Sequence, residues 1–407
     1  MSALHISIRS TLTGTVSGLP ASKSVSNRVL ILDALSGGQS TITNLSEARD
    51  TKLMTALVSS SEKEINVMDA GTTMRFLTAY YAISGTNRIM TGTDRMKERP
   101  IHPLVDALRA IGADIRYLGK EGYPPLEILG FSGQKTKEVS VPGNLSSQYI
   151  SALMMIGPAL PSGLRINLTG HIGSKPYIRM TEEMIRMFGG QINFSGNVIE
   201  IMPGELKPVA YAVEPDWSAA GYWFSFCALA ESASIYLPGN FEKSFQGDQV
   251  ICEAGQLLGV RSERTAEGLT LRKSGHQNNI EWDFTDCPDL AQTIIPLCAM
   301  KGIRGRFTGL ESLRIKETDR ILALQNELNH IGAKLSEPTT GVWNLSPIEN
   351  LPDSVIIKTY HDHRMAMGFA PWATKIPVTI EDRDVVNKSY PRFWEDLSSI
   401  GFKLSAV

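Results

Sequence analysis

A pattern of one amphipathic helix followed by two short strands returns along this chain at intervals of about 70 residues. Each predicted helix ends at an apolar residue followed by glycine, which accepts the left-handed conformation without a Cβ clash. The marker glycines are Gly112, Gly189, Gly259, Gly332 and Gly401. Alternating segments such as Asp114–Tyr117 and Leu126–Leu129 follow as strands, and a weaker first copy covers 51–67. We therefore predict an α/β (α+β) chain of about six duplicated helix–sheet units.

Composition narrows the class of protein further. With 407 residues, 42% hydrophobic and 20% charged, the chain is globular, with two or three domains. A net charge of −2 provides no overall field for nucleic acid or an anionic membrane. The four cysteines form no C-x-x-C pair, which argues against structural zinc or a disulfide framework and favours a reducing compartment. The N-terminus shows no signal pattern and the longest apolar stretch, Tyr149–Leu160, is too short to span a bilayer, so we expect a cytoplasmic protein.

Cations gather at predicted helix starts, beginning with the segment Ala21–Arg28. Lys23 lies at the N-terminal end of a predicted helix that follows Pro20, and Arg28 lies about one and a half turns further along it. Backbone N–H groups, the positive helix end and two cations together suit an anion, although an ordinary capped surface helix has the same pattern.

Similar segments recur in the first half of the chain. Gly71 precedes a predicted helix over Phe76–Ile83, and the segment Thr91–Pro100 is expected to be a loop that holds Arg95. Hydroxyl and amide side chains then open two further helices, at Ser146, Ser147 and Gln148 and again at Ser174 and Tyr177. Simple turns, solvated charges and helix capping are the alternatives for these segments.

The second half adds carboxylates. Asp289 stands at a helix start, where capping is the alternative. On a helix, Lys316 and Arg320 would share one face with Glu317 beside them, either as a surface ion-pair ladder or as a site for a reacting anion that needs proton transfer.

Two further cationic segments end the series. His363 and Arg364 precede an apolar helix, and a metal held by His361 and His363 would lack a third ligand at suitable spacing. Lys388 stands just ahead of the last helix. No phosphate-binding loop or dinucleotide glycine motif accompanies these residues, so together they indicate an enzyme that handles two small anions.

With these segments the chain resembles the 5-enolpyruvylshikimate-3-phosphate synthase family of the shikimate pathway, one of the enolpyruvyl transferases. The resemblance runs from Pro20 to Pro391 through ordered motifs: Ser22-Lys23-Ser24-x-x-x-Arg28, Ala70-Gly71-Thr72-x-Met74-Arg75, Arg95-Met-Lys-Glu-Arg-Pro, Ser146-Ser147-Gln148, Ser174-Lys-Pro-Tyr177, Pro288-Asp289, Lys316-Glu317-Thr-Asp-Arg320, Asp362-His363-Arg364-Met-Ala-Met and Lys388. Asp69, Phe76 and Ser312 depart from the expected pattern, where Asn, Pro and Asn are common. None of the three removes a catalytic group.

The resemblance implies two domains, 1–20 plus 214–407 and 21–213, each of three helix–sheet units. The crossovers would form a hinge near Leu19–Ser22 and Val213–Asp216, with the substrates bound between domains that close on them. It implies small-molecule substrates only, no metal or organic cofactor, no nucleic acid and no membrane; a monomer is our default expectation.

The implied reaction transfers the enolpyruvyl group of phosphoenolpyruvate to the 5-hydroxyl of shikimate 3-phosphate and releases phosphate. Catalysis is assigned to Asp289 on the hydroxyl, Glu317 at C3 and Lys23 on the leaving phosphate, and which proton each acid moves stays open. Shikimate 3-phosphate would contact Lys23, Ser24, Arg28, Ser146, Ser147, Gln148, Ser174, Tyr177, Asp289 and Lys316. Phosphoenolpyruvate would contact Lys23, Gly71, Arg95, Gln148, Arg320, His363, Arg364 and Lys388. Gly71, in place of alanine, suggests room for the herbicide glyphosate.

Two other functions remain as alternatives. The sister transferase that acts on UDP-N-acetylglucosamine carries a cysteine in the loop where this chain has Thr91–Pro100, and here no cysteine precedes Cys227. A non-catalytic phosphometabolite-binding paralogue would not need Lys23, Asp289 and Glu317 together.

Overall fold

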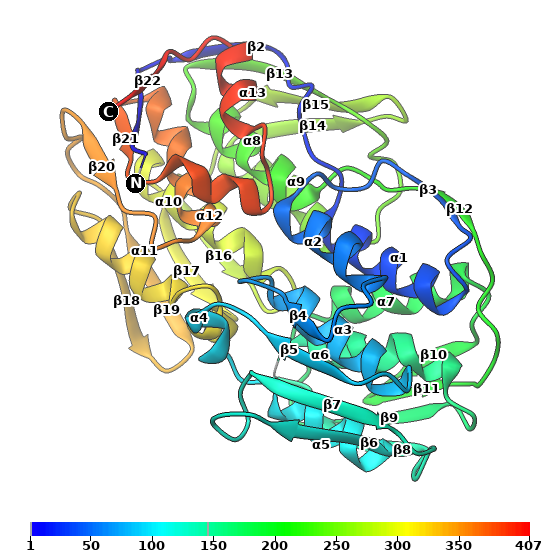
Figure 1. Cartoon of the computed structure of the whole chain (residues 1–407). Helices are drawn as coiled ribbons and strands as arrows, with labels where there is room; N and C mark the ends of the chain where they lie inside the picture. Colours follow the sequence, from blue (N-terminus) through cyan, green and yellow to red (C-terminus); the bar gives the residue numbers. More distant parts are fainter. Residues whose placement is uncertain (1, 145) are drawn as a thin grey trace. The chain divides into compact units, whose positions relative to one another are not determined.

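A computed structural model of the chain describes residues 2–144 and 146–407, so Met1 of the N-terminal segment and Leu145 of the segment before α6 lie outside the described residues. The chain divides into two compact units (Figure 1). Unit 1 comprises Met1–Ser22, Glu47–Arg49 and Glu214–Val407, and unit 2 comprises Lys23–Ser46 and Asp50–Val213. Two segments of unit 1 connect it to unit 2, and their backbones are hydrogen-bonded to each other. Ser22 N donates to Glu214 O at 2.8 Å, and Asp216 N donates to Pro20 O at 2.9 Å.

The described part of unit 1 holds three four-stranded sheets that share one topology. In each sheet the first two strands are parallel and the remaining neighbours are antiparallel. Their orders are β2 (Thr11–Thr15)-β13 (Ser232–Pro238)-β15 (Gly268–Lys273)-β14 (Val260–Arg264), β16 (Asn279–Asp283)-β17 (Arg304–Thr308)-β19 (Val342–Ser346)-β18 (Lys334–Thr339), and β20 (Val355–Ile357)-β21 (Val378–Ile380)-β1 (Leu4–Ile6)-β22 (Leu404–Ala406).

Unit 2 repeats this topology in its described residues. The orders are β4 (Glu64–Asn66)-β5 (Arg88–Thr91)-β7 (Leu126–Phe131)-β6 (Ala113–Tyr117) and β8 (Glu138–Pro142)-β9 (Leu164–Thr169)-β11 (Val198–Ile201)-β10 (Ile192–Ser195). A third sheet is reduced to the parallel pair β3 (Thr41–Thr43) and β12 (Ala210–Ala212). Three sheets in each unit agree with six duplicated units, one of them incomplete.

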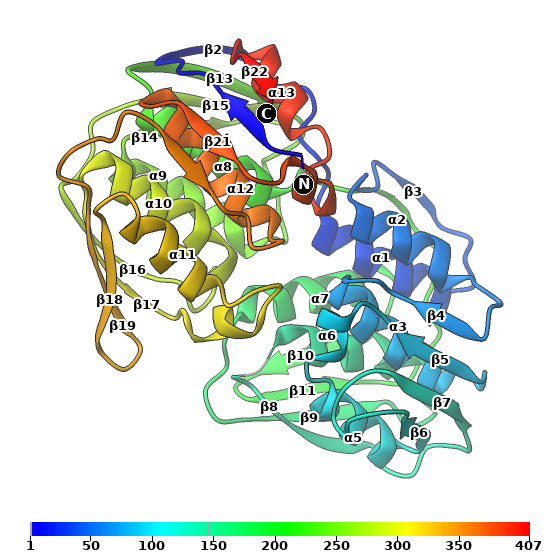
Figure 2. The same cartoon turned by 60° about the vertical axis from the view of Figure 1, so that its left-hand side comes forward.

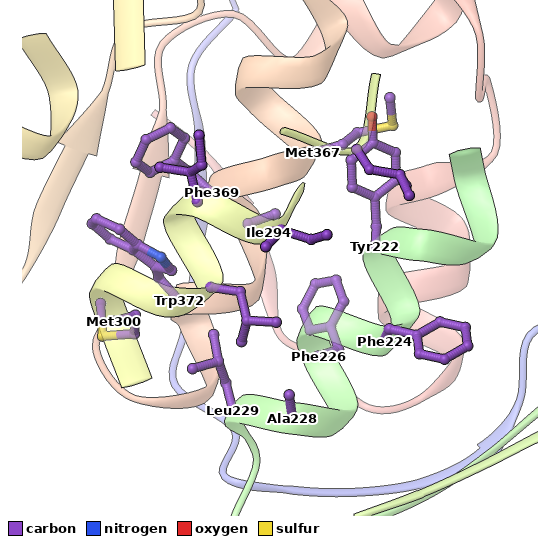
Figure 3. Close-up of a cluster of buried hydrophobic side chains, with 14 of the residues drawn as sticks. Tyr222, Phe224, Phe226, Ala228, Leu229, Ile294, Met300, Met367, Phe369 and Trp372 are labelled. Atoms are coloured by element: carbon purple, nitrogen blue, oxygen red, sulfur yellow. The ribbon is translucent and has the colours of Figure 1, made fainter. Parts of the chain in front are cut away.

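Buried helices form the centre of unit 1. Helices α8 (Trp217–Leu229), α10 (Ala291–Lys301) and α12 (His363–Phe369), which continues as the 3₁₀ turn η5 (Ala370–Thr374), lie side by side (Figures 1 and 2). Helix α8 is apolar around nearly its whole circumference, as a fully buried helix must be. Figure 3 shows Phe226 of this helix turned towards Ile294, and Tyr222 beside Met367. Helices α9 (Ile251–Leu258), α11 (Arg320–Asn329) and α13 (Phe393–Ser399) keep one face exposed.

Unit 2 has a corresponding set of helices. Helices α1 (Lys23–Leu35), α3 (Gly71–Ile83) and α6 (Ser147–Ile156) pack on one another, and α7 (Lys175–Met187) packs on α1 and α6. Helices α2 (Arg49–Val58) and α5 (His102–Ile111) have an exposed face. The predicted helix stops are confirmed: all five marker glycines have positive φ, from 82° at Gly332 to 132° at Gly112. Within the described residues, no helix is both long and apolar enough to cross a membrane.

Three local predictions were wrong. Helix α3 begins at Gly71, five residues earlier than expected, and the expected loop Thr91–Pro100 contains the short helix α4 (Asp94–Lys97), which begins because Thr93 caps it. Lys316 and Arg320 do not share a helix face. Lys316 is extended (φ −84°, ψ −154°) after the 3₁₀ turn η4 (Glu311–Ile315), and α11 begins only at Arg320 because the Asp319 carboxylate accepts from two backbone N–H groups there.

Candidate active site

In unit 1, the N-terminal ends of the three buried helices carry polar side chains that meet at Arg364. This arginine is the second residue of α12, and its guanidinium donates to Asp289 Oδ2 at 2.8 Å. Asp289 belongs to the 3₁₀ turn η3 (Pro288–Leu290) that leads into α10. Arg364 also contacts Ser218 Oγ at 3.3 Å and the Tyr222 hydroxyl at 3.4 Å, both on α8. Because a helix N-terminus is positive, this convergence favours anions.

Arg320 is the buried centre of a network of three carboxylates. Its side chain is 2% exposed and donates to Asp362 Oδ2 at 2.7 Å, Asp289 Oδ1 at 2.9 Å and Glu317 Oε2 at 2.9 Å. Burial alone would lower the pKa of Arg320, but the three carboxylates outweigh it and raise the pKa above its usual range. The other oxygen of Glu317 lies 3.6 Å from Lys388 Nζ, so Glu317 contacts two cations.

The structure decides between the two interpretations of Asp289. Cys287 holds the cap position of η3 and makes no side-chain capping bond, while Asp289 pairs with Arg320 and Arg364, so the capping alternative was wrong. Burial would raise the pKa of Asp289, but Arg364, Lys316 and Arg320 outweigh it and hold the pKa well below its usual range. Asp289 is therefore ionised.

His363 is the first residue of α12 and is almost fully buried, with Nδ1 3.6 Å from Asp362 Oδ1. Asp362 caps this helix by accepting from Arg364 N at 2.9 Å and also holds Arg320. Among the described residues, no group of three or more His, Cys, Asp or Glu side chains is arranged to hold a metal ion.

Sequence reasoning missed one carboxylate of this cluster. Asp248, in the 3₁₀ turn η2 (Gly247–Val250), is 3% exposed and accepts a hydrogen bond from the Ser218 hydroxyl. Burial, followed by the charge of Asp289, raises its pKa to about 7. Ser218 thus links Asp248 to Arg364. In the sequence, Gln246-Gly-Asp248 looks like an ordinary turn, so no local signal identifies it.

Unit 2 presents a second cluster, at the N-terminal end of α1. Lys23 Nζ lies 3.2 Å from Asp50 Oδ2 on α2. Arg28 is buried: its Nε donates to Thr181 Oγ1 at 2.7 Å, and its Nη atoms donate to Ser24 O at 2.9 Å and Ser151 Oγ at 3.0 Å. Burial lowers the pKa of Arg28 to about 10, which still leaves it charged near neutral pH.

Aromatic rings complete the surroundings of Arg28. Its Cζ lies 5.3 Å from the ring centroid of Phe76 and 5.8 Å from that of Tyr177. Phe76 is one of the departures from the family pattern, and here it supplies a cation–π face. Three of the five guanidinium N–H donors of Arg28 bond to the protein, so this arginine supports the cluster as well as offering charge to a ligand.

The starts of α3 and α6 are joined by a hydrogen bond from Gln148 Nε2 to Thr72 Oγ1 at 3.0 Å. Ser146 caps α6, as its capping alternative predicted, and Ser147 is buried beside it. Ser174 precedes α7 in the left-handed conformation, at φ 56°, and makes no capping bond within that helix.

Arg95 and Arg99 stand on the neighbouring segment. Arg95 keeps 46% of its side chain exposed and pairs with Glu98 at 2.9 Å. Arg99, which belongs to a family motif but was not predicted as a site residue, is buried, with guanidinium atoms 2.7 to 2.9 Å from the point where a Cβ on Gly71 would lie. Gly71 therefore lets an arginine approach the backbone at the start of α3.

The repeated sheets and the two charged clusters are typical of a two-unit α/β enzyme that acts on anions. The fold matches a solved structure of EPSP synthase from Acinetobacter baumannii, with a TM-score of 0.80 over 100% of both chains at 22% identity. The family model for EPSP synthase (3-phosphoshikimate 1-carboxyvinyltransferase) matches residues 6–62 and 56–397. The chain belongs to the EPSP synthase family and is a carboxyvinyl transferase.

Curated relatives share most of the chain. A 3-phosphoshikimate 1-carboxyvinyltransferase from Bacteroides fragilis is 45% identical over 391 residues, covering 94% of both chains. One from Methanospirillum hungatei is 34% identical, also covering 94% of both chains. The family prediction made from the motifs is thereby confirmed, and neither alternative function is favoured.

Proposed function

We propose that the enzyme joins phosphoenolpyruvate to shikimate 3-phosphate and that the two clusters supply its binding and catalytic groups. The 5-hydroxyl oxygen adds to C2 of the enol while C3 gains a proton. The intermediate then loses a C3 proton and the bond from C2 to the phosphate oxygen breaks, which releases inorganic phosphate. The atoms of the two substrates equal those of the enolpyruvyl product and inorganic phosphate, so the reaction needs no oxidant and no cofactor. The observation that carries the proposal is the convergence of Asp289, Glu317, Arg320, Arg364 and Lys388.

The ion pairs of this cluster suggest how a substrate changes it. Arg320 and Arg364 both pair with Asp289, so Asp289 is a weak base while these pairs persist. A phosphate or carboxylate that binds the arginines shares their positive charge, and the pKa of Asp289 then rises towards a value useful for accepting the hydroxyl proton. Binding of phosphoenolpyruvate thus prepares the base for the sugar hydroxyl.

We assign the proton at C3 to Glu317. It bridges Arg320 and Lys388, two cations assigned to phosphoenolpyruvate, so its carboxylate lies beside the bound enol in this proposal. His363 is assigned to the same substrate from the adjacent helix end.

The unit 2 cluster supplies the remaining contacts. The helix end that holds Ser146, Ser147 and Gln148, together with Ser174 ahead of α7, offers hydroxyl and backbone donors for the phosphate of shikimate 3-phosphate. Ser24 and Arg28 are assigned to its carboxylate, and Tyr177 to the ring.

The other groups of unit 2 face phosphoenolpyruvate in this proposal. Lys23 neutralises the leaving phosphate, at the cost of its ion pair with Asp50. Gly71 contributes its backbone N–H group, and Arg95 its positive charge, to the binding of phosphoenolpyruvate. In unit 1, Lys316 is assigned to a hydroxyl of the sugar.

The proposal also covers the domains, assembly and location. The paired segments around Ala21 and Pro215 would act as the hinge between domains 1–20 plus 214–407 and 21–213. We infer a monomer in the cytoplasm. The free state of all four cysteines in the described residues supports a reducing location, because disulfides are rare there.

The decisive experiment measures phosphate release with both substrates, with each alone, and with UDP-N-acetylglucosamine as the acceptor. Release only with shikimate 3-phosphate is expected. Release with UDP-N-acetylglucosamine would support the sister transferase, and silence with both acceptors in folded protein would support a binding-only role.

Two variants test the assigned roles. Glu317→Gln should lower kcat by about 100-fold or more, since it removes a proton-transfer group. Asp289→Asn should lower kcat but also lower KM for phosphoenolpyruvate, because Arg320 and Arg364 lose a competing carboxylate. The exposed Glu311→Gln is the matched control. An unchanged kcat in Glu317→Gln would refute its catalytic role.

A further inference from the structure

A second group of cations lies in unit 1, at the opposite ends of the buried helices. Helices α8 and α10 carry Ser218 and the Asp289 turn at their N-terminal ends, and they end at Leu229 and Lys301. In Figure 3, Leu229 and Met300 lie at one end of these helices and Tyr222 at the other. The 13 residues of α8 separate the two ends by about 18 Å. The groups at the C-terminal ends are therefore remote from the candidate active site within unit 1.

A cavity of about 400 Å³ opens at these C-terminal ends. Lys273, Lys301 and Lys375 line it, and His276 adds a fourth nitrogen base, while Glu349 is the one acid among its lining residues in the described structure. The volume falls in the range of sites for small organic ligands. None of these residues has been assigned to the transferase reaction.

Helix capping explains part of this arrangement. Lys301 Nζ donates to Ala228 O at 2.5 Å, and Lys273 Nζ donates to Ala230 O, so both ammonium groups lie at the negative end of α8. Lys375 directly follows η5 and is half-buried. Two lysines would be enough to cap one helix end, and the third adds positive charge to the same cavity.

Burial and mutual repulsion both lower the pKa values of two of these lysines. Burial first, and then the charges of Lys273 and Lys375, lower the pKa of Lys301 to about 8. Burial and Lys375 likewise lower the pKa of Lys273. The thiols of Cys227 and Cys298 act in the opposite direction on Lys301 but are neutral near pH 7. An anion placed among the three lysines would relieve this repulsion.

We propose that this cavity binds a small organic anion, whose phosphate or carboxylate group contacts Lys273, Lys301 and Lys375. The rest of the ligand is apolar, because Leu229, Met300, Ile348 and Leu351 supply the remaining walls. Leu351 is 52% exposed, so the apolar wall reaches the surface and leaves an entrance. The site is independent of the transferase reaction and of the residues proposed for it.

The test uses phenyl phosphate and inorganic phosphate as ligands and the reactivity of Lys301 as the local signal. Amine-directed labelling near neutral pH, read by mass spectrometry, should modify Lys301 readily because its pKa is lowered. Phenyl phosphate should protect Lys301 by occupying the cavity and raising that pKa, and inorganic phosphate should protect it more weakly, since it lacks an apolar part. The peptides that carry Lys23 and Lys388 report binding at the candidate active site in the same experiment.

Lys375→Gln provides the sharper result. It removes one charge without touching the lysines that bond to helix carbonyls. The free variant should label more slowly at Lys301, because the pKa of Lys301 rises. Protection by phenyl phosphate should need about tenfold more ligand, as expected for one lost charge-assisted bond. Lys334→Gln, an exposed lysine on β18, is the matched control and should behave as the wild type.

Three outcomes would overturn the proposal. They are no protection of Lys301 by either anion, equal protection by phosphate and phenyl phosphate, and equal protection in the wild type and Lys375→Gln. In the first case Lys273 and Lys301 serve only to cap the end of α8. Because labelling is read at Lys301 itself, failure here leaves the proposed transferase function untouched.

Discussion

Replacing Asp248 by asparagine should remove one large contribution to the pH dependence of stability in unit 1. The carboxyl is buried, and the groups that face it are Asp289, Arg364, Ser218 and Asp216. Burial and the charge of Asp289 raise its pKa to about 7, from an ordinary value of 3.8. Between these two values the folded state binds a proton that the unfolded state releases. This contribution to stability is complete below about pH 4 and is lost as the pH rises through 7.

The structure sets the magnitude. The difference between about 7 and 3.8 corresponds to about 4 kcal/mol, since each tenfold change in proton affinity is worth about 1.4 kcal/mol. Asp289 does not mask the effect, because its pKa lies below its usual range and it stays ionised in this window. Asparagine has the same shape and never ionises. The stability of Asp248→Asn relative to the wild type should therefore rise by about 3 kcal/mol between pH 4.5 and 8.5, since about 2.5 pH units of this window lie below the pKa of about 7.

Tryptophan fluorescence isolates the relevant unit. All six tryptophans of the chain belong to unit 1, so urea unfolding followed by this signal reports unit 1 alone. The free energy of unfolding is measured from pH 4.5 to 8.5 for the wild type and Asp248→Asn, with the exposed Asp353→Asn as control. Parallel curves for the wild type and Asp248→Asn would refute the reasoning, because they would mean that Asp248 is ionised throughout.

Two further predictions concern unit 2. Gly71→Ala puts a methyl group within 2.7 to 2.9 Å of the buried Arg99 guanidinium, which must shift. Because the guanidinium is the far end of a flexible side chain, the shift should cost little stability, and its effect should fall on the bound anion. Glyphosate inhibition, measured as Ki against phosphoenolpyruvate, should weaken about fivefold, the equivalent of about 1 kcal/mol. Equal Ki values in the two proteins would contradict the hypothesis that Gly71 leaves room for glyphosate. Arg28→Lys loses the guanidinium group that donates to both Thr181 and Ser151. This change should lower the free energy of unfolding of unit 2 by about 2 kcal/mol. Hydrogen exchange of α1 and α7 amides measures this loss. Thr181→Ser keeps the hydroxyl but removes one buried methyl group, so it should cost only about 1 kcal/mol. Unchanged exchange in Arg28→Lys would argue against the buried network.

Much of the fold could be predicted because its signals are local. A helix that ends at glycine depends on a few neighbouring residues, and the strands after Gly112 and Gly259 follow as the period requires. Likewise Lys23 marks the start of α1 from its position after Pro20. Where two local signals competed, prediction failed: the Asp319 cap prevailed over the i, i+4 spacing of Lys316 and Arg320, and separated them.

The partners of the charged side chains could be decided only by the tertiary structure. Asp289 meets Arg364 across 75 residues of sequence and Arg320 across 31, and no local pattern distinguishes these ion pairs from helix capping. Asp248 and the lysines of the remote cavity gave no signal at all, since burial and mutual charge, which set their pKa values, exist only after folding. The sequence by itself determined the repeated units and which helix ends are charged. Only packing decided which charges meet, because electrostatic coupling depends on distance and burial rather than on order in the chain.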